Sequence, residues 1–279
     1  MQTPPSATSD QHLPRERADQ QFSDPRPGSQ PDPYDVRQYS RLGVLGVWAA
    51  AALPMAALAW VVAPAIAGHG ASQHRFVLTL LVALTIGLVW QAVLVLLLVW
   101  RERRDASWTS LRDRLWLRAP STSTRRGGRL WLWVLVYALG LAALDMLPFG
   151  PIGPNDRSFG SFLGSPEGQA TFHHAWGLYL LVAVELAFNT FLGEELLFRG
   201  LLLPRMRRAF GRTDWVVNGV LFGFYHLHQP WSIPNAVVTG LLYTFPAYRF
   251  RSTWMAIILH SAQSVFFAFL VLGVVLGLA

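Results

Sequence analysis

The sequence contains no cysteine, and only 14% of its 279 residues are charged. The missing cysteines exclude disulfides, a thiolate nucleophile, thiolate zinc ligands and a cysteine-linked lipid on this chain. Hydrophobic residues, by contrast, make up 52% of the chain, and twelve residues are tryptophan. Such a composition is typical of a polytopic membrane protein rather than of a soluble globule.

Positive side-chain charge comes from arginine alone, and the formal net charge of the chain is +7. A basic chain can bind nucleic acid, but nearly all of these arginines flank apolar stretches. Their distribution therefore indicates membrane topology, and we expect no nucleic-acid partner.

Seven apolar stretches predict the fold. Most of them reach the ~20 residues that a helix needs to span ~30 Å of hydrocarbon, and two are short, as helices buried among others can be. We predict an all-α protein, a polytopic membrane bundle of about seven transmembrane helices. The predicted helices cover residues 42–67, 76–100, 130–147, 174–203, 214–228, 233–249 and 254–278.

The arginines also predict the orientation of the bundle. With the N-terminus in the cytoplasm and each helix reversing the side, twenty arginines fall inside the cell. Arg75 and Arg157 fall outside, and Arg199 lies within the membrane. Because loops rich in arginine stay in the cytoplasm, we predict a multi-pass protein of the cell membrane with a cytoplasmic N-terminus.

Three parts are expected along the chain. Residues 1–40, rich in Pro, Ser, Asp, Gln and Arg, are predicted to be a disordered cytoplasmic tail. Residues 41–173 are predicted to hold the first transmembrane helices and an irregular outer loop at 148–173. In this part, residues 107–119 suit an amphipathic helix on the inner leaflet, with an ordinary connector as the alternative. Residues 174–279 form the third part, a helical core.

The stretch FLGEELLFRG, residues 191–200, places three charges in an apolar helix. Uncompensated, they would oppose membrane insertion by roughly 8 to 10 kcal/mol. Glu195 and Arg199 are four residues apart with the acid first, so they can form an ion pair within the helix. Glu194 points about 100° away, and its carboxylate suits general-base work, with a structural role in a polar crevice as the alternative. We expect Glu185 to reach the far interface.

Two histidines fall at a similar depth on other predicted helices. FGFYHLH places Phe222 four residues before His226, and ILHSAQS places His260 four residues before Ser264. Counted at 1.5 Å per residue from the cytoplasmic Arg205, Arg212 and Arg251, the side chains of Glu194, His226 and His260 lie roughly 16, 21 and 13 Å deep. Since intramembrane polar residues tend to face one another or a water-filled cavity, we expect one shared site, with satisfied core histidines as the alternative.

These side chains suit hydrolysis by water. A carboxylate can act as base, one histidine can orient the water, and the second can help to stabilise an oxyanion. A serine hydrolase is less supported, because the sequence has no G-x-S-x-G elbow. Two histidines and a glutamate could also bind zinc, but the H-E-x-x-H spacing is absent.

The three patterns together resemble the CPBP intramembrane endopeptidases, also called the CAAX prenyl protease 2 or bacteriocin self-immunity family. In that family EExxxR, FxxxH and HxxxN or HxxxD lie on separate membrane helices. The resemblance covers about residues 174–270. Here the patterns read Glu194-Glu195-x-x-x-Arg199, Phe222-x-x-x-His226 and His260-x-x-x-Ser264.

The resemblance implies a membrane protease that cleaves a membrane-associated peptide or protein near the cytoplasmic face. In that reading Glu194 activates water, His226 orients it and His260 contributes to oxyanion stabilisation. Glu195 with Arg199 forms the supporting pair. The resemblance implies no resident metal or other cofactor, with a divalent metal as the open alternative.

Ser264 departs from the family pattern, which has Asn or Asp at this position, and with Phe222 it completes the expected supporting residues. Serine is the shorter donor, and the loss of one oxyanion donor costs on the order of 2.7 to 4 kcal/mol in the barrier. Gln263, Asn189 or Asn218 could compensate. The alternative function is therefore a weak or inactive scaffold or immunity protein that binds a peptide in the same crevice. A proton-relay transporter is a third hypothesis, but the halves of the chain show no inverted repeat.

Overall fold

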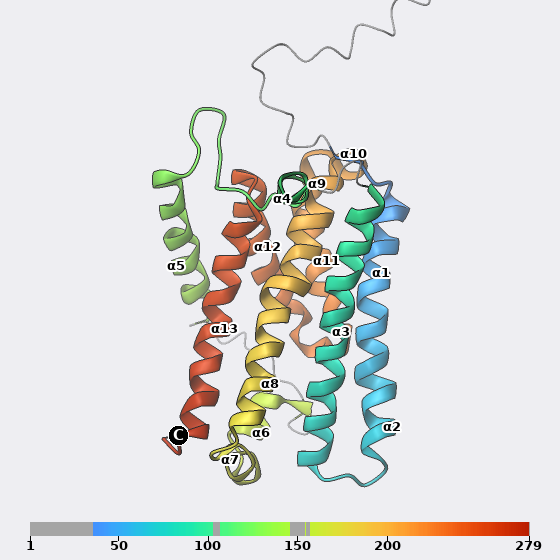
Figure 1. Ribbon diagram of the computed structural model, residues 1–279, viewed down its shortest axis with the longest axis vertical. Coiled ribbons are helices and arrows are strands. Elements are labelled where there is room, and N and C mark those ends of the chain that lie inside the picture. The colour runs from blue at the N-terminus through green and yellow to red at the C-terminus, as the bar shows by residue number, and fades with distance from the viewer. Residues whose placement is uncertain (1–35, 103–106, 146–153, 155–156, 279) are drawn as a thin grey trace, which may run out of the picture.

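The computed structural model describes residues 36–102, 107–145, 154 and 157–278. In these ranges the chain is an elongated bundle of helices (Figure 1), and its one β-type pairing is an isolated bridge between Ser121 and Arg126. The predicted all-α class is confirmed. Most of the predicted tail and the start of the predicted outer loop lie outside the described residues.

The bundle has helices at each of the seven predicted stretches. Two π-helical segments, η2 (Leu58–Val62) and η5 (Phe188–Leu202), continue α1 and α8, and short 3-10 turns η3 (Gly128–Leu132), η6 (Gly211–Thr213), η7 (His226–His228) and η8 (Pro230–Ser232) join others. The α-helices are α1 (Arg41–Ala57), α2 (Ala63–Ala67), α3 (Gln73–Glu102), α4 (Trp108–Arg114), α5 (Trp133–Asp145), α6 (Phe159–Leu163), α7 (Pro166–Phe172), α8 (Trp176–Ala187), α9 (Leu203–Arg205), α10 (Arg207–Phe210), α11 (Asp214–Tyr225), α12 (Ile233–Phe250) and α13 (Thr253–Val275).

Four helical segments of the described chain are long and apolar enough to cross a membrane. They are Arg41–Ala67, Gln73–Glu102, Trp176–Arg205 and Thr253–Val275. A shorter apolar segment covers Gly128–Leu144. Length and composition thus support a membrane protein built as a helix bundle, whereas the number of helices that cross and the side of the N-terminus stay predictions.

The two ends of the bundle differ in charge. Helices α4, α9 and α10 lie at one end, and α2, α6, α7 and the C-terminus lie at the other (Figure 1). The first end carries most of the described arginines, whereas Arg75 and Arg157 lie near the second. The arrangement agrees with the predicted sidedness, and we refer to the first end as the arginine-rich end.

The connector after α3 is a shorter helix than predicted. Only Trp108–Arg114 is helical, and the chain then turns inward, with Trp116 at a φ of 50° and fully buried. Thr253 at the start of α13 donates to the carbonyl oxygens of Leu115 and Trp116 through its hydroxyl and its amide. The connector is therefore anchored to the bundle and does not form one continuous surface helix.

Helices α11 and α12 form a closely packed antiparallel hairpin. A Cβ atom on Gly223 would lie 2.2 Å from a methyl group of Val237, and one on Gly240 would lie 2.7 Å from the carbonyl oxygen of Gly219. Only glycine permits this approach of two helices. The hairpin turns at η7 and η8, because Pro230 disfavours helical backbone at Gln229. The predicted helix to residue 228 consequently ends at Tyr225.

Candidate active site

The span that carries the two glutamates is π-helical from Phe188 to Leu202, where the sequence predicted an ordinary α-helix. At its end the amide of Leu203 donates to the carbonyl oxygen of Phe198, five residues earlier. A π-helix has more residues per turn than an α-helix and rises less per residue. The depth of roughly 16 Å that we estimated for Glu194 from an α-helical rise is therefore too large.

The π-helix changes which side chains face α13. In a helix with i to i+5 bonding, residues five apart are neighbours on the surface as well as residues four apart, whereas in an α-helix the neighbours are three and four apart. Thr190 and Glu195 are five apart on η5, and Ser264 and His260 are four apart on α13. The hydroxyls of Thr190 and Ser264 are 2.5 Å apart, and His260 Nδ1 lies 3.0 Å from Glu195 Oε1. The two different helix periods thus bring both pairs into register.

The predicted ion pair between Glu195 and Arg199 is present and fully buried. Arg199 Nη1 donates to Glu195 Oε1 at 2.9 Å, and both side chains are 0% exposed. The other two guanidinium nitrogens donate to Thr244 Oγ1 at 3.1 Å and to the carbonyl oxygen of Gly240 at 3.0 Å. A buried charge is tolerated when it is paired and hydrogen-bonded in this way.

Phe222 joins the three sequence patterns. The Arg199 guanidinium lies over its ring at 4.2 Å from the centroid. Its edge contacts both histidines, with centroid distances of 5.1 Å to His226 and 6.2 Å to His260. Arg199 and the two histidines therefore meet around a phenylalanine that the sequence marked only as a supporting residue, and a site that Glu194 shares with both histidines stays a prediction.

The two histidines are oriented in a similar way. His226 Nδ1 lies 3.0 Å from the carbonyl oxygen of Phe222, and His260 Nδ1 lies 3.0 Å from Glu195 Oε1. A carbonyl oxygen only accepts, so the neutral His226 ring carries its proton on Nδ1 and keeps a lone pair on Nε2. The carboxylate partner orients His260 in the same way.

Glu194 is 3% exposed, and within the described part of the chain its carboxyl group makes no hydrogen bond. It is close enough to Glu195 and Arg199 to interact with both electrostatically. Its oxygens are thus not used by the packing of the bundle. In the described residues no group of three or more His, Asp or Glu side chains is placed to hold a metal ion.

Residues 175–266 match a family model described as type II CAAX prenyl endopeptidase Rce1-like. This segment of the chain is similar to that family. All three patterns lie inside the Rce1-like segment, so the resemblance to the CPBP endopeptidases is confirmed. No curated protein and no solved structure gave a match. The family supports a membrane-embedded endopeptidase of the CAAX protease type in general.

The Rce1-like segment also contains a histidine that the sequence analysis did not identify. The rings of His228 and His226 are stacked, 5.4 Å apart and 29° from parallel. His228 Nδ1 is buried without a hydrogen-bond partner in the described structure. The H-L-H spacing alone does not predict the stacking, which depends on the 3-10 turn that replaces the end of the predicted helix.

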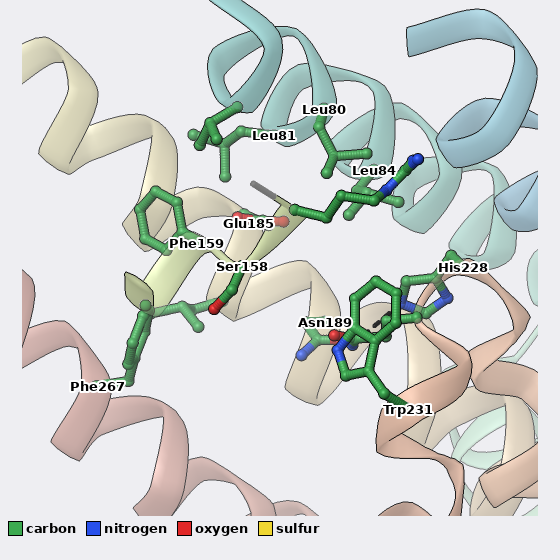
Figure 2. A pocket seen from close by; sticks show the side chains of 15 residues that line it. Leu80, Leu81, Leu84, Ser158, Phe159, Glu185, Asn189, His228, Trp231 and Phe267 are labelled. Carbon is green, nitrogen blue, oxygen red and sulfur yellow. Dashed lines mark hydrogen bonds between the residues drawn. The ribbon is translucent and has the colours of Figure 1, made fainter. Parts of the chain in front are cut away.

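His228 borders a cavity of about 360 Å³ that also includes Glu185 and Asn189 (Figure 2). Glu185 and Asn189 are four residues apart, at the junction of α8 and η5. Glu185, predicted to reach the far interface, is directed into this cavity with leucines of α3 on one side. Residues of α6, η7 and η8 line the same cavity, and whether Glu185 also reaches the far interface stays a prediction.

Several polar residues were considered as substitutes for the oxyanion donor that the family has at position 264, and their hydrogen bonds differ. Ser264 itself is hydrogen-bonded to Thr190. Gln263 accepts a hydrogen bond from the Tyr243 hydroxyl. Asn218 donates to the carbonyl oxygen of Phe198 at 2.8 Å and accepts from Thr244, which also bonds Arg199. Asn218 thus belongs to the support of the ion pair.

Proposed function

We propose that this protein is an intramembrane endopeptidase that hydrolyses a peptide bond of a membrane-associated protein or peptide. The observation that carries the proposal is the meeting of Arg199, His226 and His260 around Phe222 inside the Rce1-like segment, with Glu194 near enough to Arg199 to interact with it electrostatically. The proposed setting is the cell membrane, crossed several times, with cleavage near its cytoplasmic side. The bilayer and the substrate are the partners.

In the proposed reaction Glu194 is the general base. Its carboxylate removes one proton from a water molecule that donates its other hydrogen to His226 Nε2, and the water oxygen attacks the peptide carbonyl carbon. The carbonyl oxygen becomes an oxyanion, which a donor on His260 Nε2 stabilises. Glu194 then gives its proton to the amide nitrogen, the C–N bond breaks, and a carboxylate and an amine are released.

The supporting pair acts through His260. Glu195 accepts from His260 Nδ1 and so fixes the ring orientation, while Arg199 neutralises the carboxylate that does so. A carboxylate that accepts from Nδ1 stabilises an imidazolium, and in that form a histidine also donates from Nε2. We assign Glu195 and Arg199 as positioning residues, because neither is proposed to contact the reacting atoms.

Cleavage of a membrane-peptide library tests the proposal. The wild type and the Glu194→Ala variant are purified in detergent and incubated with the library, with and without a strong chelator, and products are read by mass spectrometry. We expect peptides cleaved by the wild type alone, with the same products in chelator. Thermal unfolding of both proteins shows that the variant is folded. Equal cleavage by both would contradict the assignment of Glu194, and loss in chelator alone would contradict the metal-free route.

A second candidate is a membrane scaffold or immunity protein that binds a peptide in the same crevice without cleaving it. The observation that favours it is the hydrogen bond between Ser264 and Thr190, which engages the hydroxyl at the position where the family has Asn or Asp. Under this alternative, folded wild type binds a library peptide but cleaves none, and the Glu194→Gln variant binds equally well. Any Glu194-dependent cleavage removes it.

A further inference from the structure

The cavity beside His228 has mixed walls. Leucines of α3, Phe159, Trp231 and Phe267 make most of its lining, while Glu185 and Asn189 supply polar groups (Figure 2). Its volume of about 360 Å³ lies within the usual range of ligand sites, which are largely apolar with a few placed polar groups.

The cavity continues the candidate active site along two elements. Asn189 is five residues before Glu194 on the π-helix, so the two are neighbours on successive turns. On the other side, His228 in the cavity wall stacks on His226. The cavity is also lined by Ser158 and Phe159 at α6, so it extends from the site toward the end of the bundle where Figure 1 shows α6 and α7.

The Glu185 carboxyl group lines the cavity and makes no hydrogen bond or ion pair within the described structure. The nearest arginine in the lining, Arg157, is held elsewhere: its guanidinium lies 3.9 Å from the Trp60 ring centroid and donates to the Ala59 carbonyl oxygen at 2.7 Å. A partly buried carboxylate without a partner is unfavourable, so a cation that enters the cavity would be favoured.

We propose that this cavity binds a lysine or arginine side chain of the peptide substrate. Glu185 forms the ion pair, the Asn189 amide oxygen accepts a further hydrogen bond, and Trp231 offers an aromatic face to the cation. The proposal rests on the proposed function and adds a substrate preference to it.

The spacing along the helix predicts where the basic residue lies in the substrate. Glu185 is nine residues before Glu194, at most roughly 13 Å along a helix that rises 1.5 Å per residue. An extended peptide covers that length in about three to four residues. We therefore expect the basic residue about three to four positions from the cleaved bond. It lies in the part of the bound peptide that points away from the arginine-rich end of the bundle.

The test compares a peptide that has arginine at this position with one that has glutamine. For the wild type we expect kcat/KM to favour the arginine peptide by at least ~10-fold, the ratio that one modest ion pair supplies. Glu185→Gln should reduce the ratio to about one. Glu167→Gln, which alters an exposed acid on α7 outside the cavity, is the matched control and should keep it. A wild-type ratio near one, or a ratio that persists in Glu185→Gln, overturns the proposal.

Two further measurements separate this proposal from the proposed function. If the wild type cleaves neither peptide, the proposed function fails. The cavity is then tested by the equilibrium dissociation constants of the two peptides, and the arginine peptide should bind at least ~10-fold more tightly than the glutamine peptide. If Glu185→Gln does not fold, a photoreactive group beside the arginine is cross-linked to wild-type protein. Labelling of residues 228–231 supports the cavity, and labelling confined to other elements overturns it.

Discussion

Arg199 and Arg205 lie six residues apart on one helical span, and each is fully buried in an ion pair with a glutamate. Arg205 pairs with Glu102 at the end of α3 at 2.7 Å, and the Tyr39 hydroxyl donates to the same carboxylate at 2.6 Å. We name Arg205–Glu102 the saturated pair, because both Glu102 oxygens accept hydrogen bonds. We name Arg199–Glu195 the open pair, because Glu195 Oε2 is buried without a partner in the described structure.

The saturated pair fastens elements together. Arg205 also donates to the carbonyl oxygens of Arg114 and Leu201, and the amide of Tyr39 donates to the Arg205 carbonyl oxygen. Burial, together with the hydrogen bond to Glu102, raises the pKa of the Tyr39 phenol above its ordinary value, so it remains a donor. This network joins the start of α1, the end of α3, the connector and α9.

The open pair instead contacts residues that we propose to be catalytic. It holds His260, lies beside Glu194 and keeps one oxygen unused. Buried polar groups are normally satisfied, and exceptions call for an explanation such as a catalytic role. The comparison teaches that a buried ion pair alone does not mark a site in this bundle. The site is marked instead by polar groups beside the ion pair that have no hydrogen-bond partner in the described structure.

The largest effect on stability is expected at the saturated pair. Glu102→Gln leaves the buried Arg205 without a counter-charge, and we expect the free energy of unfolding in detergent to fall by about 3–5 kcal/mol. Denaturant unfolding measures the loss, with Glu167→Gln as the surface control. Cleavage per folded molecule should stay at the wild-type level. Wild-type stability in Glu102→Gln would show that the pair does not fasten the elements.

A smaller effect is expected at the open pair, measured as a coupling. Glu195→Gln and Arg199→Met each leave a buried charge alone, whereas the double variant removes both charges. Each single variant should therefore unfold at a lower temperature than the double, with a coupling of about 0.5–3 kcal/mol. A double-variant cycle in detergent measures it. Additive losses would refute the pair.

The smallest effect is expected at the bond that aligns η5 with α13. Ser264→Ala removes the partner of Thr190, and a hydrogen bond of this kind contributes about 0.5–1.5 kcal/mol. Thr190→Val should cost a similar amount, and the two together little more than either alone. Unfolding of the three variants measures this. Independent, additive losses would mean that the two hydroxyls do not stabilise the alignment.

Local patterns predicted much of the bundle. Apolar stretches located the helices, and the four-residue spacing of Glu195 and Arg199 predicted their ion pair. Depth predicted a site shared by polar groups of several helices, because polar groups in a membrane tend to face one another. The contacts of Phe222 with Arg199, His226 and His260 agree with this, while the place of Glu194 beside the histidines stays a prediction. These features depend on neighbours in the chain or on the bilayer, and both can be read from the sequence.

The π-helix could not be predicted in this way. Its register depends on Thr190 and Glu195 meeting Ser264 and His260 on a helix about 70 residues away in the chain. The cavity at Glu185 was missed for a similar reason, since its walls come from several distant elements. Among these differences from the prediction, the end of α11 alone could have been predicted from a nearby residue, because Pro230 disfavours a helix at Gln229.

The central claim is that Glu194 performs the chemistry while the saturated pair only holds the fold. The direct measurement is cleavage of one membrane peptide by wild type, Glu194→Gln and Glu102→Gln at equal folded protein, with thermal unfolding of each. We predict that Glu194→Gln loses at least ~100-fold in kcat/KM at an unchanged midpoint, the range for a general base. Glu102→Gln should keep the wild-type kcat/KM per folded molecule and unfold at a lower temperature. Wild-type cleavage by folded Glu194→Gln would contradict the account.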